Sequence, residues 1–367
     1  MNMVQKIVDL IENNTDFTLE GIKFLDSGNG HDVFEITIKD FPPLVARIEK
    51  PNVRVAQDGV KRDTHFNGPL SVKRQASLYD LVRVEAGLPA PKVYAISEKS
   101  GPPFIITEKM NGVHWREYLE ANNYSKQAYL KSLSFFGADL AAVQQVRFSS
   151  FGNVIAKNLI ESGGISGLEN YLHRIIQLKL QRVSEQEAFT IDELDSLKNY
   201  FNYTLSIIEN EIKVHEQSPV LVLTDLHPMN FYVDEMGKPS GYFDLESCQS
   251  GHPALEFYQI GMQFLNYFND AMFTCAKDAF VSGFEENGGC YDWEHPLNKQ
   301  VENILCVAHL TGSVGSYKGA RDGLRDNWSD NFKEILFDVI NTGGMDYVTF
   351  AEVLRQKTKQ PKHVTLP

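Results

Sequence analysis

The sequence predicts an α+β fold, with strands gathered in about the first 110 residues and helices dominating the rest. Runs rich in β-branched and aromatic residues support the strands, at 21–25, 33–38, 44–48 and 104–107. After residue 111, apolar residues recur at helical spacing, for example at Leu133, Phe136, Leu140 and Val143. A chain of 367 residues is also long enough for two ordinary domains with substantial cores.

The overall composition limits the classes of partner. Hydrophobic residues make up 43% and charged residues 23%, which is ordinary for a globular protein that folds throughout. The formal net charge of −13 disfavours nucleic acid and anionic membranes as partners, and it leaves room for a cationic substrate. The sequence has no secretory signal and no apolar run near the ~20 residues that span a bilayer, so we expect a cytoplasmic protein.

The N-terminal elements follow one another closely. Val4, Ile7, Val8 and Ile11 have helical spacing and predict a helix over 4–12. Two strands then flank a loop, 27–32, whose glycines would let the backbone approach phosphates, although an ordinary tight hairpin explains such a loop equally well. The next strand, 44–48, carries a cation at Arg47, either as a phosphate ligand or as a solvated side chain.

The stretch 219–246 has the most informative pattern in the chain. Its runs 231–233 and 241–243 are β-rich and are separated by a turn containing Gly237 and Pro239, so they predict an antiparallel hairpin. Asn230 and Asp244 would then meet at the open end of the hairpin. Oxygen donors at this spacing favour Mg²⁺, and Pro228 bends the preceding loop so that Asp225 can face the same cavity.

These residues resemble a known family. The segments Asp-Leu-His-Pro-Met-Asn (225–230) and Phe-Asp-Leu-Glu (243–246) are similar to the catalytic core of the aminoglycoside phosphotransferase and choline kinase families. The resemblance implies a two-lobed, protein-kinase-like fold. It predicts an N-terminal nucleotide-binding lobe over 1–110, with an antiparallel sheet, and a larger, mainly helical catalytic and acceptor-binding lobe over 111–367.

The resemblance also implies roles for single residues. Asp225 would be the catalytic base, and Asn230 and Asp244 would hold Mg²⁺ on the phosphates of ATP or GTP. Further nucleotide-binding residues follow by position. They are Ser27, Gly28 and Gly30 in the loop over the phosphates, Arg47 as the phosphate-contacting cation, and Glu108 and Met110 in the hinge beside adenine.

The chain departs from the family pattern at two positions. Leu223 stands where the family has a scaffold His, and Gln75 stands where a Glu normally pairs with the cation on the strand. Gln75 cannot neutralise Arg47, and Glu85 is the nearby carboxylate that could substitute. Glu256 replaces a structural Asp, and we expect it to cap a helix.

The leading hypothesis is an ATP-dependent phosphotransferase that acts on a hydroxyl of a small molecule, such as an aminoglycoside-like antibiotic, an amino alcohol or a sugar. A catalytically inactive kinase fold that binds nucleotide or a partner is the alternative, because of Leu223 and Gln75. A protein kinase is disfavoured, since the chain has no Asp-Phe-Gly or Ala-Pro-Glu segment. The loop 162–167 could border the acceptor site.

Overall fold

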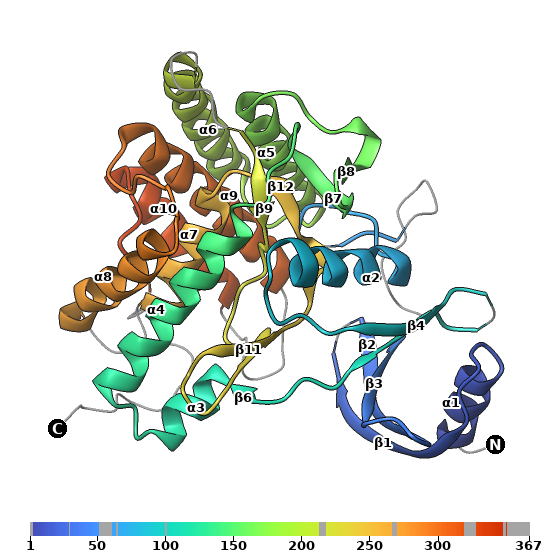
Figure 1. Cartoon of the computed structure of the whole chain (residues 1–367). Coiled ribbons are helices and arrows are strands. Elements are labelled where there is room, and N and C mark those ends of the chain that lie inside the picture. The colour runs from blue at the N-terminus through green and yellow to red at the C-terminus, as the bar shows by residue number, and fades with distance from the viewer. Residues whose placement is uncertain are drawn as a thin grey trace.

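The computed structural model describes residues 3–28, 30–50, 61–63, 65–99, 101–212, 218–265, 270–318, 328–347 and 350. It has the two-lobed arrangement of a protein-kinase-like fold. An antiparallel sheet with one helix beside it forms the N-terminal part, and helices surround two small sheets in the remainder (Figure 1). The predicted α+β fold class is therefore confirmed.

The N-terminal sheet has five strands in the order β1-β2-β3-β5-β4, and each neighbouring pair is antiparallel. Alternate residues of β2, Phe34, Ile36 and Ile38, are buried against Ile7 and Ile11 of α1, as the period of two in a half-buried strand requires. The bounds are α1 (Met3–Glu12), β1 (Leu19–Ser27), β2 (His31–Ile38), β3 (Leu44–Glu49), β4 (Val93–Ser97) and β5 (Phe104–Glu108).

Helix α2 (Val72–Asp80) follows β3 and connects the two parts of the molecule. Ser71 caps its N-terminus by accepting a hydrogen bond from the backbone N–H of Arg74 at 3.1 Å. A π-helical turn (Leu81–Glu85) extends α2, and its buried apolar residues belong to the core of the C-terminal part. Beyond β5 the chain enters β6 (Val113–His114), which pairs with a strand of that part. The division into 1–110 and 111–367 stays a prediction.

Two small antiparallel sheets carry the segments around the predicted catalytic residues. One has the order β11-β10-β6 and the other β8-β7-β12-β9. Their bounds are β7 (Gly152–Ala156), β8 (Leu159–Ile160), β9 (Val220–Val222), β10 (Phe231–Val233), β11 (Pro239–Tyr242) and β12 (Gln249–Gly251).

Helices pack around these sheets and form the larger core. The buried residues of α5 recur at 168, 171, 172, 175, 176, 179 and 183, which is one face of a helix. The bounds are α3 (Trp115–Ala121), α4 (Lys126–Val143), α5 (Leu168–Glu185), α6 (Ile191–Ile212), α7 (Ala254–Ile260), α8 (Asp270–Glu286), α9 (Pro296–Tyr317) and α10 (Trp328–Thr342). Short 3-10 turns lie at Glu161–Gly163 and Leu245–Ser247, and a second π-helical turn at Gly261–Leu265.

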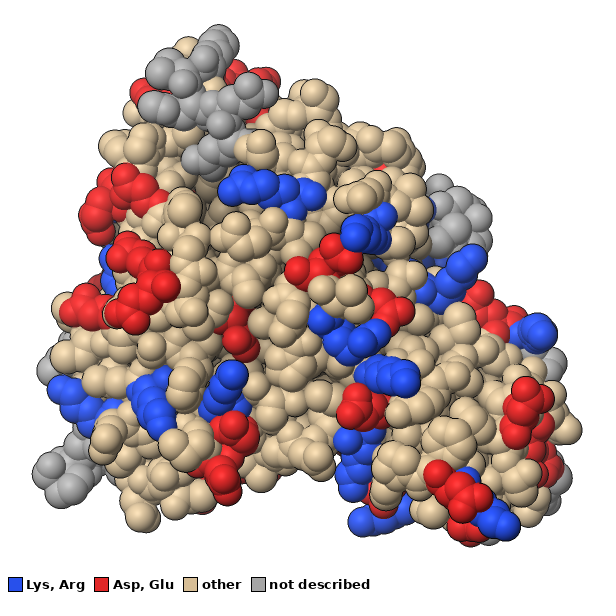
Figure 2. All heavy atoms as spheres, in the orientation of Figure 1, with Lys and Arg blue, Asp and Glu red and all other residues tan. Residues whose placement is uncertain are grey.

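The surface agrees with an ordinary globular protein. On the face seen in Figure 2, charges of both signs are interspersed, so the net negative charge does not form a single patch there. Within the described residues, no helix is both long enough and apolar enough to cross a membrane.

Candidate active site

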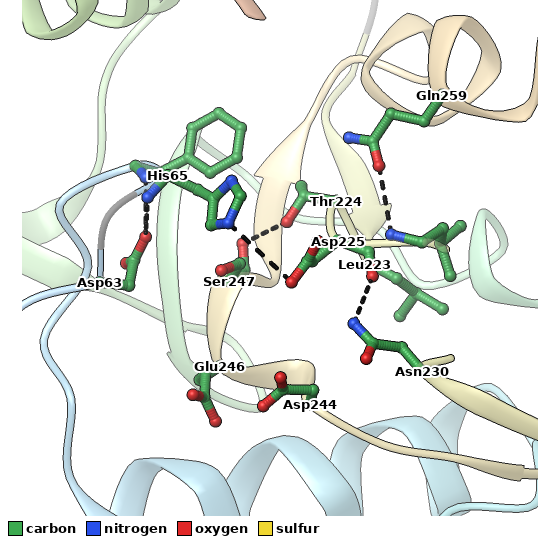
Figure 3. A network of polar contacts seen from close by, with 12 residues as sticks. Asp63, His65, Leu223, Thr224, Asp225, Asn230, Asp244, Glu246, Ser247 and Gln259 are labelled. Carbon is green, nitrogen blue, oxygen red and sulfur yellow. Dashed lines mark hydrogen bonds and ion pairs between the residues drawn. The ribbon is translucent and has the colours of Figure 1, made fainter. Parts of the chain in front are cut away.

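The predicted catalytic loop leaves the buried strand β9 and turns sharply at Thr224. This residue has φ of 64°, which is unusual for a β-branched side chain, and its Oγ1 donates a hydrogen bond to the carbonyl of Ser247 at 2.7 Å. The turn presents Asp225, whose side chain is 27% exposed and therefore accessible (Figure 3). Backbone strain at this position is compensated by the contact with the segment after Asp244.

Asn230 and Asp244 flank the hairpin that the sequence predicted. Phe231 pairs with Tyr242, and the backbone N–H of Phe243 donates to the carbonyl of Asn230 at 2.9 Å. The side-chain Nδ2 of Asn230 donates to the carbonyl of Asp225 at 2.9 Å, which leaves its carboxamide oxygen for another ligand. Figure 3 shows Asp225, Asn230 and Asp244 near one another at this end of the hairpin.

The turn of the hairpin requires a glycine at position 237. Gly237 has φ of 79°, and a Cβ there would meet the ring of Tyr118 at 2.6 Å. The second strand begins at Pro239, two residues earlier than the predicted 241–243, and ends at Tyr242.

Arg47 reaches the same place from β3. Its guanidinium contacts Asp244 at 3.0 Å, Glu246 at 3.7 Å and the hydroxyl of Tyr79 at 2.8 Å. Burial opposes ionisation of Asp244, but the charge of Arg47 outweighs it and lowers the pKa of that carboxyl. The Asp244 carboxylate is therefore ionised at neutral pH.

Glu246 bridges Gln75 and Arg47. Gln75, on α2 as predicted, donates to Glu246 Oε2 at 2.7 Å, so Glu246 links Gln75 to the guanidinium. Burial, together with the neighbouring Asp244 carboxylate, raises the pKa of Glu246 to about 8. Glu85 does not take this role, because its carboxylate binds Lys157 at 2.7 Å.

Glu256 holds the start of the predicted catalytic loop. Its Oε1 accepts a hydrogen bond from the backbone N–H of Leu223 at 2.5 Å, and its Oε2 accepts one from Gln144 at 3.3 Å. It lies inside α7, and the N-cap residue Pro253 has no side-chain capping hydrogen bond, so the predicted capping role is wrong. Leu223 itself is 1% exposed and fills the core where the family has a His.

Lys50, which no sequence pattern indicated, holds the loop between β1 and β2. Lys50 Nζ donates to Ser27 Oγ at 2.6 Å and to the carbonyl of Gly28 at 2.5 Å, and its backbone N–H donates to the carbonyl of Gly30. Neither glycine has positive φ, so freedom of φ is not what these positions require. A Cβ at Gly30 would meet nothing within 4 Å, so the space beside this glycine is open.

The predicted hinge residues follow β5. The backbone N–H of Glu108 is engaged by the carbonyl of Lys92 at 2.8 Å, and its own side chain is exposed. Met110 packs against Gly241 of β11 and is half-buried. A contact of either residue with adenine stays a prediction.

His65 is a neighbour of Asp225 that nothing in the sequence pattern indicated. Its Nε2 lies 3.9 Å from Asp225 Oδ2, although the two residues are far apart in the chain (Figure 3). Burial lowers the pKa of His65, and the attraction of Asp225 opposes that effect without cancelling it. His65 is therefore mainly neutral near pH 7.

The donors at the hairpin end fit a hard cation. They comprise a free carboxamide oxygen on Asn230 and an ionised carboxylate on Asp244, with the Glu246 carboxyl next to it. Oxygen donors of this kind suit Mg²⁺. The guanidinium of Arg47, which reaches from β3 to the hairpin, is a cation that suits the phosphates of a nucleotide.

Comparisons with known proteins agree with this arrangement. A family model described as the phosphotransferase enzyme family matches residues 21–293. No curated protein matches the sequence.

Three solved structures are similar in fold. A candidate fructosamine-3-kinase from Thermobifida fusca aligns with a TM-score of 0.53 at 12% identity, over 97% of this chain and 99% of its own. The aminoglycoside phosphotransferase APH(2'')-Ib with ADP bound has a TM-score of 0.52 at 12% identity, covering 96% and 98%. A macrolide 2'-phosphotransferase type I has a TM-score of 0.50 at 12% identity, covering 96% of each chain.

Proposed function

The chain belongs to the phosphotransferase enzyme family and is a small-molecule kinase, and we propose that it transfers the γ-phosphate of ATP or GTP to a hydroxyl of a small acceptor, with Asp225 as base. The observation that carries this proposal is the convergence of Asp225, Asn230 and Asp244 from two sides of one hairpin, with Arg47 of the N-terminal sheet against Asp244.

Each residue has a role that its environment supports. Asp225 accepts the hydroxyl proton while the acceptor oxygen bonds to the γ-phosphorus, and the bond from that phosphorus to the bridging oxygen breaks, so that the nucleoside diphosphate leaves with the electron pair. Arg47 orients the phosphates, and Lys50 holds the loop of Ser27, Gly28 and Gly30 above them. Mg²⁺, when bound, would be held by Asn230 and Asp244 and would neutralise charge on the phosphates.

The two departures from the family pattern are compensated, which favours an active enzyme over an inactive fold. Leu223 keeps its backbone N–H bonded to Glu256, and the ionised Asp244 supplies Arg47 with the carboxylate that Gln75 lacks. The fold neighbours suggest sugars, aminoglycosides and macrolides as classes of acceptor to try first.

The test is nucleoside diphosphate formation by the purified chain with Mg²⁺ and ATP or GTP, across sugars, sugar acids, amino alcohols, aminoglycosides and macrolides. We expect at least one acceptor to stimulate turnover, and Asp244→Ala to abolish that stimulation. Nucleotide that binds without turnover in any acceptor class would contradict the proposal and favour the inactive fold.

A further inference from the structure

A cavity of about 870 Å³, a size that holds a small molecule, is lined in part by His65, the neighbour of Asp225. Helix α5 forms one wall, and the loop 162–165 and the described residues of 61–67 form others. His65 connects the cavity to the candidate active site, because it lines the cavity and its Nε2 is 3.9 Å from the Asp225 carboxylate. A hydroxyl compound in the cavity would therefore be within one side chain, His65, of the proposed base.

The cavity wall carries more cations than carboxylates, in contrast to the protein as a whole. The cations are Arg62, Arg174, Lys179 and Arg182, and the carboxylates are Asp63, Glu161 and Glu185.

The carboxylates are largely engaged by the protein itself. Asp63 accepts hydrogen bonds from the backbone N–H groups of His65, Phe66 and Gly68. Glu161 binds Arg62 at 2.7 Å, and Glu185 accepts a hydrogen bond from Gln181 at 2.9 Å. Within the described residues none of the three forms an ion pair with Lys179 or Arg174, although the charge of Asp63 favours the ammonium form of Lys179.

Lys179 is the most unusual of the cations. It occupies the buried stripe of α5 and is 8% exposed, yet in the described part of the chain its ammonium forms no ion pair. Its contacts are the carbonyl of His65 at 2.7 Å and the ring of Phe66, with Nζ 5.4 Å from the ring centroid. An ammonium has three donors, and a buried cation without a counter-ion is destabilising. Burial accordingly lowers the pKa of Lys179 to about 8.

Arg174 is a second cation that α5 contributes to the cavity lining. It lies five residues before Lys179 on α5 and is exposed, and among the residues described it has neither an ion pair nor a side-chain hydrogen bond. An anion bound in the cavity could thus meet one buried and one accessible cation without displacing a protein carboxylate.

We propose that this cavity is the acceptor site and that the acceptor carries an anionic group, such as a carboxylate, which binds Lys179 and Arg174 while its hydroxyl faces Asp225. This proposal rests on the proposed function. The net charge of −13 left room for a cationic acceptor, but binding depends on the charges that line the cavity, and those favour an anion.

The first test uses inorganic sulfate as the probe and does not require turnover. Its binding to the full chain is measured by calorimetry with saturating Mg²⁺ and ADP, against chloride at equal ionic strength. Lys179→Met should weaken sulfate binding by about tenfold or more, and the exposed Arg174→Gln by a few-fold. Lys198→Gln, which removes an exposed cation from α6, is the matched control and should change nothing. No sulfate binding, or equal binding by wild type and both cavity variants, would overturn the proposal.

The second test separates this proposal from the function on which it rests. Glucuronate, glucose and glucosamine are compared as acceptors that differ in charge on a common ring, and we expect glucuronate to be preferred in a manner that Lys179→Met removes. Turnover of glucosamine above glucuronate, unchanged in Lys179→Met, would overturn the anionic acceptor and leave the kinase function standing. Sulfate binding that depends on Lys179, without turnover of any acceptor, would support the anion site and count against the kinase function.

Discussion

The buried carboxyl of Glu256 should make the stability of the fold depend on pH. It is fully buried and accepts hydrogen bonds from the backbone N–H of Leu223 and from Gln144, and burial raises its pKa from 4.5 to about 7. This pKa shift corresponds to about 3 kcal/mol of folding free energy. Below pH 4.5 Glu256 is protonated in both the folded and the unfolded chain, so burial of its charge costs nothing. The cost grows as the pH rises from 4.5 to about 7 and is constant above that.

Glu256→Gln keeps an acceptor for Leu223 but cannot ionise. Its free energy of unfolding, relative to the wild type, should therefore increase by about 3 kcal/mol between pH 4.5 and pH 8, while all other groups titrate alike in the two proteins. Glu256→Ala removes both acceptors and should be less stable than Glu256→Gln by about 2–4 kcal/mol at every pH, because buried donors are left unpaired. Since Leu223 precedes Asp225 by two residues, Glu256→Ala should also lower turnover by about 10²-fold.

Urea unfolding at pH 4.5, 6 and 8 measures these differences. A gap between wild type and Glu256→Gln that stays constant with pH would refute the assignment of a buried, destabilised carboxyl. Equal stability of Glu256→Gln and Glu256→Ala would refute the role of this side chain as an anchor of the catalytic loop.

Two further changes probe the proposed metal site and the proposed acceptor cavity. Asp244→Ala should remove the Mg²⁺ dependence of ADP binding measured by calorimetry, because it deletes an ionised oxygen donor. Asp195→Ala on α6 is the control. Unchanged Mg²⁺ dependence in Asp244→Ala would contradict the assignment of Asp244 as a metal ligand. Lys179→Met should raise the free energy of unfolding by up to about 3 kcal/mol below pH 8, because the pKa of Lys179 falls from 10.5 to about 8 on folding. This gain should vanish as the pH rises to 10.5 and the lysine becomes neutral in both states, and a gain independent of pH would contradict the buried charge.

Local sequence patterns predicted the parts of the site that local geometry builds. The hairpin that carries Asn230 and Asp244 follows from two β-rich runs and a turn with Gly237, and the strand that carries Arg47 follows from its own apolar residues. Residues adjacent in the sequence are enough to determine this hairpin and this strand, so both could be predicted without knowledge of long-range contacts.

Contacts between distant segments could not be predicted in this way. Glu246 meets Gln75 across 171 residues, and His65 meets Asp225 only because the residues before α2 dock on the C-terminal part of the molecule. The direction of the Glu256 side chain likewise depends on where β9 lies beside α7. Lys179 did leave a signal, since a lysine on the apolar stripe of a helix is unusual, but the stripe shows only that it is buried and not what it faces.

The central claim is that Asp225 performs the chemistry and not the binding of nucleotide. The most direct measurement compares wild type and Asp225→Asn in phosphate transfer to one acceptor, with the dissociation constant for ADP and Mg²⁺ determined on the same preparations. We expect Asp225→Asn to lower turnover by about 10²- to 10⁴-fold with ADP affinity nearly unchanged. Turnover that survives the substitution, or turnover and ADP affinity lost together, would contradict the role of Asp225 as the base.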